Sequence, residues 1–172
     1  MNAACTDLEP ALSSLAALAD QRGLKLGLRA PRRLGIWSLQ VAVARPLAAN
    51  RAELLAEMKG WALPQPRGLQ LDTLQVLPGS DPLVGPLIWA ATMAWALEAT
   101  PCRRARFLAI RDGDHQHRRL VRYFRQLGFT PIRELGAAPL DLPLRLLWGG
   151  SGLLMSGDCR ETLRRCSRRL RR

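Results

Sequence analysis

Hydrophobic and polar residues follow each other with two different periods along this chain, and the period marks the predicted elements. Residues 36–44 alternate, with Leu39, Val41 and Val43 set against polar or small neighbours, which is typical of a half-buried strand. Residues 116–127 instead place apolar side chains three or four positions apart, as on one face of a helix. We therefore expect a protein in which strands and helices mix.

The two patterns divide the chain into an ordered series of predicted elements. Helices are predicted where apolar residues lie three or four positions apart after a capping residue, and Asn50 and Pro82 are expected to begin two of them. The predicted helices cover residues 7–21, 50–61, 82–99 and 116–127, the first with Thr6 as its cap and Glu9 completing a capping box. The predicted strands cover residues 24–28, 35–44, 69–77, 106–110, 130–135, 144–148 and 152–155. This order is typical of an α/β protein.

Residues 105–129 form the most informative unit of the chain. An apolar run of strand length is followed by Asp112-Gly113-Asp114, which supplies a turn and an acidic helix start. The helix after it has an apolar face and an arginine face, and Gly128 is expected to end it. We therefore predict a strand–helix–strand unit around which the rest of the chain is placed.

The net charge of +12 favours anionic partners, namely nucleic acid, phosphorylated cofactors, acidic proteins or an anionic membrane surface. Nearly all of this charge comes from arginine, because Lys25 and Lys59 are the only lysines. We predict one basic patch on the helix at 116–127 and another near the end of the chain. The patch residues are Arg118, Arg119, Arg122, Arg125, Arg164, Arg165, Arg168 and Arg169.

The last residues of the chain have a composition of their own. Seven arginines in 160–172 accompany Leu163, Cys166 and Leu170, which recur at helical spacing. Residues 158–172 are therefore expected to be either a basic helix or a solvated tail. Residues 1–157 are expected to form a single domain, because this length suffices for one core.

The cysteines and the N-terminus bear on metal binding and location. The four cysteines show no C-x-x-C spacing and lie far in sequence from the two histidines, so no metal site is predicted. Free thiols and the lack of a basic secretory signal favour a cytoplasmic location. The longest apolar run, residues 83–97, is interrupted by Gly85 and Pro86, so no transmembrane segment is predicted.

A resemblance to a known family rests on the segment LVRYFRQLGFTPI, residues 120–132, and on the elements around it. A strand ending in Val76-Leu77-Pro78, a long helix, a strand and a helix that stops at Gly-Phe resemble the GCN5-related N-acetyltransferase (GNAT) family. The likeness covers residues 69–154. It implies an α/β, GNAT-like (acyl-CoA N-acyltransferase) fold, in which helices flank a central mixed sheet and a V-shaped opening separates two parallel strands.

The resemblance also implies a cofactor and a place for it. Acetyl-CoA or another acyl-CoA would lie in the opening, with its diphosphate at the start of the long helix, where free N–H groups and the helix dipole attract anions. The loop there departs from the family pattern, because two prolines lack N–H groups and Asp81 adds a negative charge. The residues implied for cofactor contact are Leu77, Gly79, Ser80, Gly85 and Phe124.

Two candidate catalytic residues follow from the same resemblance. Family members often carry a tyrosine four residues before Gly-Phe as a general acid, and here that position is Phe124, with Tyr123 about 100° around the helix. The position of a frequent family asparagine is His117, which could act as a base near neutral pH. Tyr123 and His117 are therefore the candidates, and a half-buried tyrosine and a surface histidine without catalytic roles are the alternatives.

Three functions remain open from the sequence. The first is a GNAT-like N-acyltransferase that moves an acetyl or acyl group from acyl-CoA to an amine. The second is a catalytically inactive GNAT-fold binding or assembly protein for an acidic protein partner. The third is a basic nucleic-acid-binding protein, which is less favoured because the sequence has no known nucleic-acid module and few aromatic residues for stacking on bases.

Overall fold

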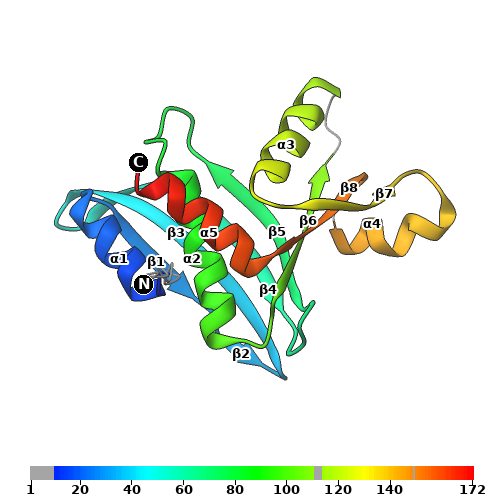
Figure 1. Ribbon diagram of the computed structural model, residues 1–172, viewed down its shortest axis with the longest axis horizontal. Helices are drawn as coiled ribbons and strands as arrows, with labels where there is room; N and C mark the ends of the chain where they lie inside the picture. The colour runs from blue at the N-terminus through cyan, green and yellow to red at the C-terminus, as the bar shows by residue number, and fades with distance from the viewer. Residues whose placement is uncertain (1–9, 111–113, 149) are drawn as a thin grey trace, which may run out of the picture.

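The computed structural model describes residues 10–110, 114–148 and 150–172, which form a mixed α/β fold with an eight-stranded mixed sheet and five α-helices (Figure 1). The helices are α1 (Leu12–Gln21), α2 (Val84–Ala99), α3 (Asp114–Gln126), α4 (Leu142–Trp148) and α5 (Cys159–Leu170), with a 3-10 turn η1 (Pro139–Asp141) before α4. The strands are β1 (Lys25–Arg29), β2 (Arg32–Arg33), β3 (Ile36–Ala48), β4 (Arg51–Ala62), β5 (Leu69–Val76), β6 (Arg104–Ile110), β7 (Thr130–Leu135) and β8 (Gly152–Asp158).

The sheet consists of two antiparallel halves that meet at one parallel pair. Its strand order is β1-β3-β4-β5-β6-β8-β7, and the short β2 pairs with the start of β3. Neighbours are antiparallel within each half, whereas β5 and β6 are parallel. Parallel neighbours need a crossover connection, which α2 supplies here. The start of α2 and the ends of β5 and β6 are thereby brought to the same part of the fold.

Helices cover the two faces of the sheet unequally. Successive residues of a strand point to opposite faces, and in β6 Phe107 and Ala109 enter the main core with α1, α2 and α5. Leu108 points the other way, into a small cluster with Leu154 of β8 and Leu144 of α4. Most helices therefore lie on one face, and α4 covers only the β6–β8–β7 part of the other face (Figure 1).

Helix α2 lies at the centre of the core and is covered by α5. It is apolar on all sides, with Ile88 and Trp89 both fully buried, as expected for a helix without a solvent face. Helix α5 packs against it with Leu163, Cys166 and Leu170. The Asp158 carboxylate caps α5 by accepting the Glu161 N–H at 3.0 Å. The arginine-rich end of the chain is thus a helix with one buried face, not a solvated tail.

The thiols on this buried face are not reactive groups. Burial raises the pKa of the Cys159 thiol to about 12, and the neighbouring Cys102 and Asp158 act in the same direction. Burial also raises the pKa of the Cys166 thiol to about 12. Only the thiolate is a good nucleophile or metal ligand, so both side chains serve as small apolar residues at neutral pH.

The predicted helix at residues 50–61 is wrong, because this segment is strand β4. Leu55, Met58 and their neighbours satisfy a helical spacing, but Met58, Gly60 and Ala62 also alternate as buried positions of a strand. The backbone of β4 pairs with β3 on one side and β5 on the other, and this pairing outweighs the local helix propensity. A Cβ atom at Gly60 would collide with the carbonyl oxygen of Gln70, so the close approach of β4 and β5 requires glycine there.

The predicted strand at residues 144–148 is also wrong, because these residues belong to helix α4. A short apolar run does not distinguish a strand from a helix, and Pro143 is acceptable in the first turn of a helix.

Two predicted helices begin later than expected. The long helix begins at Val84 and not at Pro82, and the first helix begins at Leu12 and not at residue 7. The predicted capping residues of the first helix, Thr6 and Glu9, lie outside the described residues. The strand predicted at 130–135 is confirmed as β7.

Candidate functional site

The parallel strands β5 and β6 pair over a short stretch and then share no further ladder contacts. Leu69–Leu71 of β5 pair with Ala105–Phe107 of β6, and the register ends there although both strands continue. The β4–β5 ladder shifts register between Lys59 and Gly60, directly opposite this point. A bulge bends a strand, so the shift marks the place where β5 turns away from β6. The facing backbone edges beyond it are open to a ligand that brings its own hydrogen-bonding groups.

A pocket of about 600 Å³ lies at the end of β5 and extends to the start of α2. The end of β5, the loop after it and the start of α2 meet there with one side chain from α3 and one from α5. Its walls are mostly apolar, with a few polar groups among them, as in many small-molecule sites. The lining residues are Val76, Leu77, Pro78, Gly79, Ser80, Asp81, Pro82, Leu83, Gly85, Pro86, Tyr123 and Arg169.

Tyr123 lies between this pocket and a second one of about 510 Å³, which it lines with Gln116, Arg119 and Leu120 of α3. A methyl group at Gly85 would lie 3.6 Å from the Tyr123 hydroxyl oxygen, an ordinary van der Waals contact, so the hydroxyl lies close to the start of α2. The side chain is placed here because its neighbour Phe124 points into the core, against Trp89, Phe107 and Phe129.

The Tyr123 hydroxyl keeps its proton across the physiological range. Burial raises its pKa to about 12, and the nearby Cys166 acts in the same direction. The Trp89 indole N–H is close enough to oppose this shift, although it makes no hydrogen bond of normal geometry, and Arg169 opposes it as well. The hydroxyl is therefore available to donate a hydrogen bond to a group that gains negative charge.

Arg169 is the cation among the described residues that line the pocket. It comes from the last turn of α5, and its Nη2 donates a long hydrogen bond of 3.4 Å to the Gln126 side-chain oxygen. Within the described ranges no carboxylate lies at ion-pair distance from its guanidinium. An arginine at a pocket wall without a carboxylate partner is suited to an anionic ligand group, which it can hold through two hydrogen bonds.

The start of α2 offers few donors of its own. Asp81 already accepts the Leu83 N–H at its carboxylate, at 2.8 Å, and the Val84 N–H at its carbonyl, at 3.0 Å. Pro82 and Pro86 have no N–H group. The hydroxyl of Ser80, a residue predicted to contact the cofactor, donates to the Leu77 carbonyl at 2.7 Å. Positive charge at this pocket therefore comes mainly from Arg169 and not from the helix start.

The structure brings most of the predicted site residues together but leaves two of them elsewhere. Leu77, Gly79, Ser80, Gly85 and Tyr123 share the larger pocket. Phe124 is fully buried in the aromatic cluster and does not line it. His117 lies at the start of α3, where its Nδ1 is 3.2 Å from the Ile110 carbonyl oxygen. A carbonyl only accepts, so this contact places a proton on Nδ1 and leaves Nε2 of the neutral ring as an acceptor.

Arg169 was predicted as part of a basic patch and not as a pocket residue. It lies 46 positions after Tyr123, and nothing in the sequence pattern shows that α5 returns to the start of α2. The other patch residues lie on α3 and α5, as their helical spacing predicts.

Two further properties of the described residues concern metal ions and membranes. Among the described residues no group of three or more histidine, cysteine, aspartate or glutamate side chains is arranged to hold a metal ion. None of the helices in the same ranges combines the length and the apolar character needed to cross a bilayer.

The chain was compared with protein-family models, with curated proteins and with solved structures. None of the three comparisons gives a match.

Proposed function

We propose that this protein is a GNAT-like N-acyltransferase that binds an acyl-CoA in the opening between β5 and β6. The proposal rests on the end of the β5–β6 pairing at Leu71 and Phe107, together with a pocket at the end of β5 that Tyr123 and Arg169 line. The family resemblance implies an opening between these two parallel strands, and the position of the pocket supports that expectation.

The chemistry of the opening suits the two ends of such a cofactor. Backbone groups of β5 beyond Leu71 are free on the side of β6, so they can bind the amide groups of a pantetheine arm as a neighbouring strand would. Arg169 can bind a phosphate group at the pocket wall. The apolar residues Leu77, Pro78 and Leu83 enclose the space between these ends.

The proposed reaction is the attack of an amine nitrogen on the thioester carbonyl. The C–N bond forms, the C–S bond breaks, and the sulfur leaves as a thiolate. Tyr123 stabilises this thiolate by donating a hydrogen bond, because its high pKa keeps the hydroxyl protonated at neutral pH. The proton that the amine loses passes to solvent water, because His117, the predicted base, lines neither of the two pockets.

Isothermal titration with acetyl-CoA tests the binding step. We expect acetyl-CoA to bind, and Arg169→Gln to weaken binding by about 10- to 100-fold, as for the loss of a charged hydrogen bond. Arg168→Gln removes the same charge from the neighbouring, exposed position and is expected to change the affinity by less than about twofold. S-acetylpantetheine, which lacks the nucleotide phosphates, should bind both variants equally. No binding at millimolar acetyl-CoA would contradict the proposal.

Tyr123→Phe tests the catalytic step. We expect turnover to fall by about 100-fold or more while the affinity for acetyl-CoA stays within about twofold, because the hydroxyl acts on the leaving sulfur. Release of the free thiol in the presence of a set of amines measures turnover, and titration measures affinity. An unchanged rate would exclude a role for the hydroxyl in the reaction.

A second candidate function is a non-catalytic protein of the same fold that binds an acidic partner. It is favoured by the start of α2, where Asp81, Pro82 and Pro86 leave few groups for a diphosphate. Tight binding of acetyl-CoA with turnover contradicts this candidate, whereas the absence of binding supports it.

A further inference from the structure

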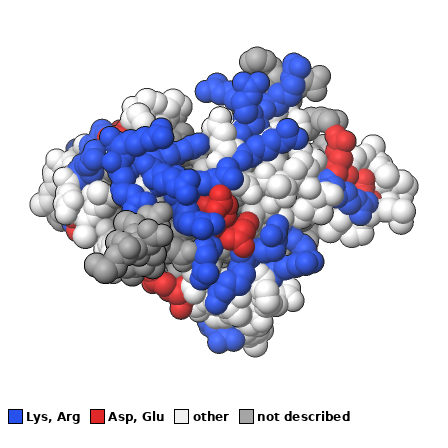
Figure 2. Space-filling view, viewed as in Figure 1, with Lys and Arg blue, Asp and Glu red and all other residues white. Residues whose placement is uncertain are grey.

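The positive charge of the protein is concentrated on two neighbouring helices. Residues 114–126 and 159–172 contain eleven of the 26 basic residues but only two carboxylates, those of Asp114 and Glu161. Figure 2 shows the corresponding basic side chains spread over one face of the molecule. We call this surface the arginine band. Its members are Arg118, Arg119, Arg122, Arg125, Arg160, Arg164, Arg165, Arg168, Arg169, Arg171 and Arg172.

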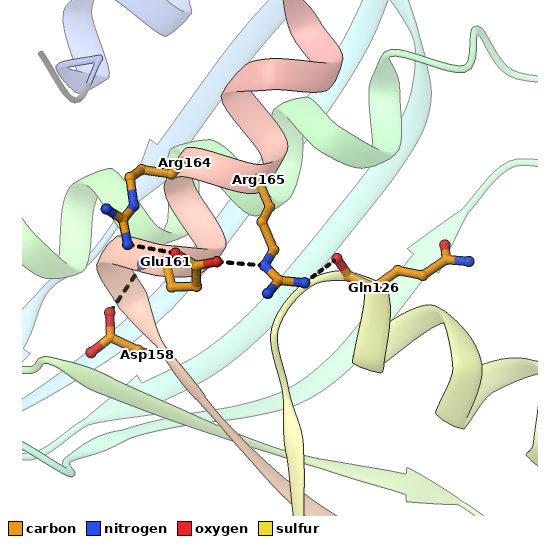
Figure 3. A network of polar contacts seen from close by, with 5 residues as sticks. All are labelled: Gln126, Asp158, Glu161, Arg164 and Arg165. Carbon is orange, nitrogen blue, oxygen red and sulfur yellow. Dashed lines mark hydrogen bonds and ion pairs between the residues drawn. The ribbon is translucent and has the colours of Figure 1, made fainter. Parts of the chain in front are cut away.

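Polar contacts join the two helices into one surface (Figure 3). Glu161 binds Arg164 at 2.5 Å and Arg165 at 2.7 Å, both on α5. Arg165 also donates to the backbone carbonyl of Gln126, at the end of α3, at 3.3 Å. Arg169 reaches the side chain of Gln126 one turn further along. The second half of α5 and the end of α3 are thus held together, so the band is continuous.

Much of the charge in the band is not neutralised within the protein. Arg122, Arg125 and Arg168 are exposed, and none of them has a carboxylate at ion-pair distance in the described part of the chain. The one carboxylate of α5, Glu161, forms the ion pairs found among the described residues with Arg164 and Arg165. Like charges held close together repel each other, and an anionic partner relieves this repulsion. The band therefore favours a partner with several regularly spaced negative charges.

The other side chains of α3 and α5 indicate which kind of anionic partner fits the arginine band. The described residues of α3 and α5 include no exposed large hydrophobic side chain, because their leucines face the core. A protein interface normally has an apolar centre, and a membrane-bound helix inserts its apolar side. The apolar side of α5 is buried against α2 and is unavailable for either. An acidic protein and a lipid surface therefore fit the band less well than a nucleic-acid backbone does.

We propose that the arginine band binds the sugar–phosphate backbone of a double-stranded nucleic acid without reading its base sequence. Guanidinium groups match phosphate oxygens through paired hydrogen bonds, and contacts to phosphates carry no sequence information. Single-stranded nucleic acid is bound through aromatic side chains that stack on bases, and the band has none exposed, since Tyr123 faces the pocket. This inference does not rest on the acyltransferase proposal, and its test leaves Arg169, which belongs to both the band and the pocket, unchanged.

The test is fluorescence anisotropy of the full-length protein with labelled 20-base-pair duplexes of RNA and of DNA at several salt concentrations. The triple variant Arg122→Gln, Arg125→Gln, Arg168→Gln is expected to bind at least about tenfold more weakly than the wild type near 100 mM salt. The slope of log affinity against log salt should fall by about 2 to 3, because each phosphate contact contributes about 0.9.

A matched control carries Arg29→Gln, Arg33→Gln and Arg67→Gln, which remove the same charge from exposed positions outside the band. We expect it to bind duplexes like the wild type. Equal loss in both triple variants would overturn the proposal, because net charge alone would then explain binding. The proposal is also overturned if the wild type binds neither duplex at 50 mM salt. The same holds if polyglutamate or phosphatidylserine vesicles bind the protein more tightly than the duplexes do.

Discussion

A chain that ends at Asp158 is expected to lose its cooperative thermal unfolding transition. This truncation removes α5, which covers α2 with Leu163, Cys166 and Leu170, all of them nearly fully buried. Each large apolar side chain contributes about 1.5–3 kcal/mol on burial, and a domain is stable by only about 5–15 kcal/mol in total. The loss of these contacts, together with the exposure of the α2 residues beneath them, is comparable with the whole stability of the domain.

Circular dichroism during heating measures this effect, and a chain ending at Leu170 is the control. The control loses only Arg171 and Arg172, both exposed, and should unfold within a few degrees of the full chain. Leu163→Ala removes only part of the contact between α5 and α2, and we expect it to lower the free energy of unfolding by about 2–5 kcal/mol. If the chain ending at Asp158 unfolds like the full chain, α5 is not part of the core.

The second large effect is expected at Phe124. Its ring is fully buried. The ring centroid lies 4.6 Å from that of Phe107 and 5.9 Å from those of Trp89 and Phe129. Phe124→Ala should lower the free energy of unfolding by about 3–5 kcal/mol, because it leaves a cavity among these rings. Urea denaturation followed by tryptophan fluorescence measures the change.

Tyr123→Phe is the matched comparison, since it changes the next residue of the same helix. Its ring keeps its apolar contacts and loses one hydroxyl at a pocket wall, so stability should change by less than about 1 kcal/mol. We therefore expect the two neighbours to separate cleanly, with Phe124 needed for folding and Tyr123 for turnover. A large loss of stability from Tyr123→Phe would show that its hydroxyl is mainly structural.

The sequence predicts elements well where a single pattern dominates. The alternation in β3 and the amphipathic spacing of α3 are not compatible with another element, and both are found. Residues 51–62 carry Leu, Ala, Glu, Met and Lys, which favour helices locally. Their strand conformation depends on backbone pairing with β3 and β5, which no local pattern contains. The wrong prediction there follows from tertiary contacts that outweigh propensity.

Some residues of the candidate site can also be predicted from the sequence, whereas others depend on tertiary packing. The loop residues Leu77, Gly79 and Ser80 can be placed at the pocket from their position between a strand and a helix. Tyr123 and Phe124 are neighbours on α3, and the rotation of this helix determines which of them lines the pocket. Phe124 packs against Trp89 in the core, so Tyr123 is the one that lines the pocket. The contribution of Arg169 depends on the path of α5 across the core, which the sequence does not specify.

The position of α5 in the chain has a consequence for the order of synthesis. Every strand of the sheet and helix α2 precede α5, so a ribosome completes them before the covering helix emerges. During that interval one side of α2 has no partner, and its apolar residues are exposed to other nascent chains. Burial of the Cys159 and Cys166 thiols must also wait until α5 has packed against α2. Alkylation of these two thiols in stalled chains would therefore report when the core closes.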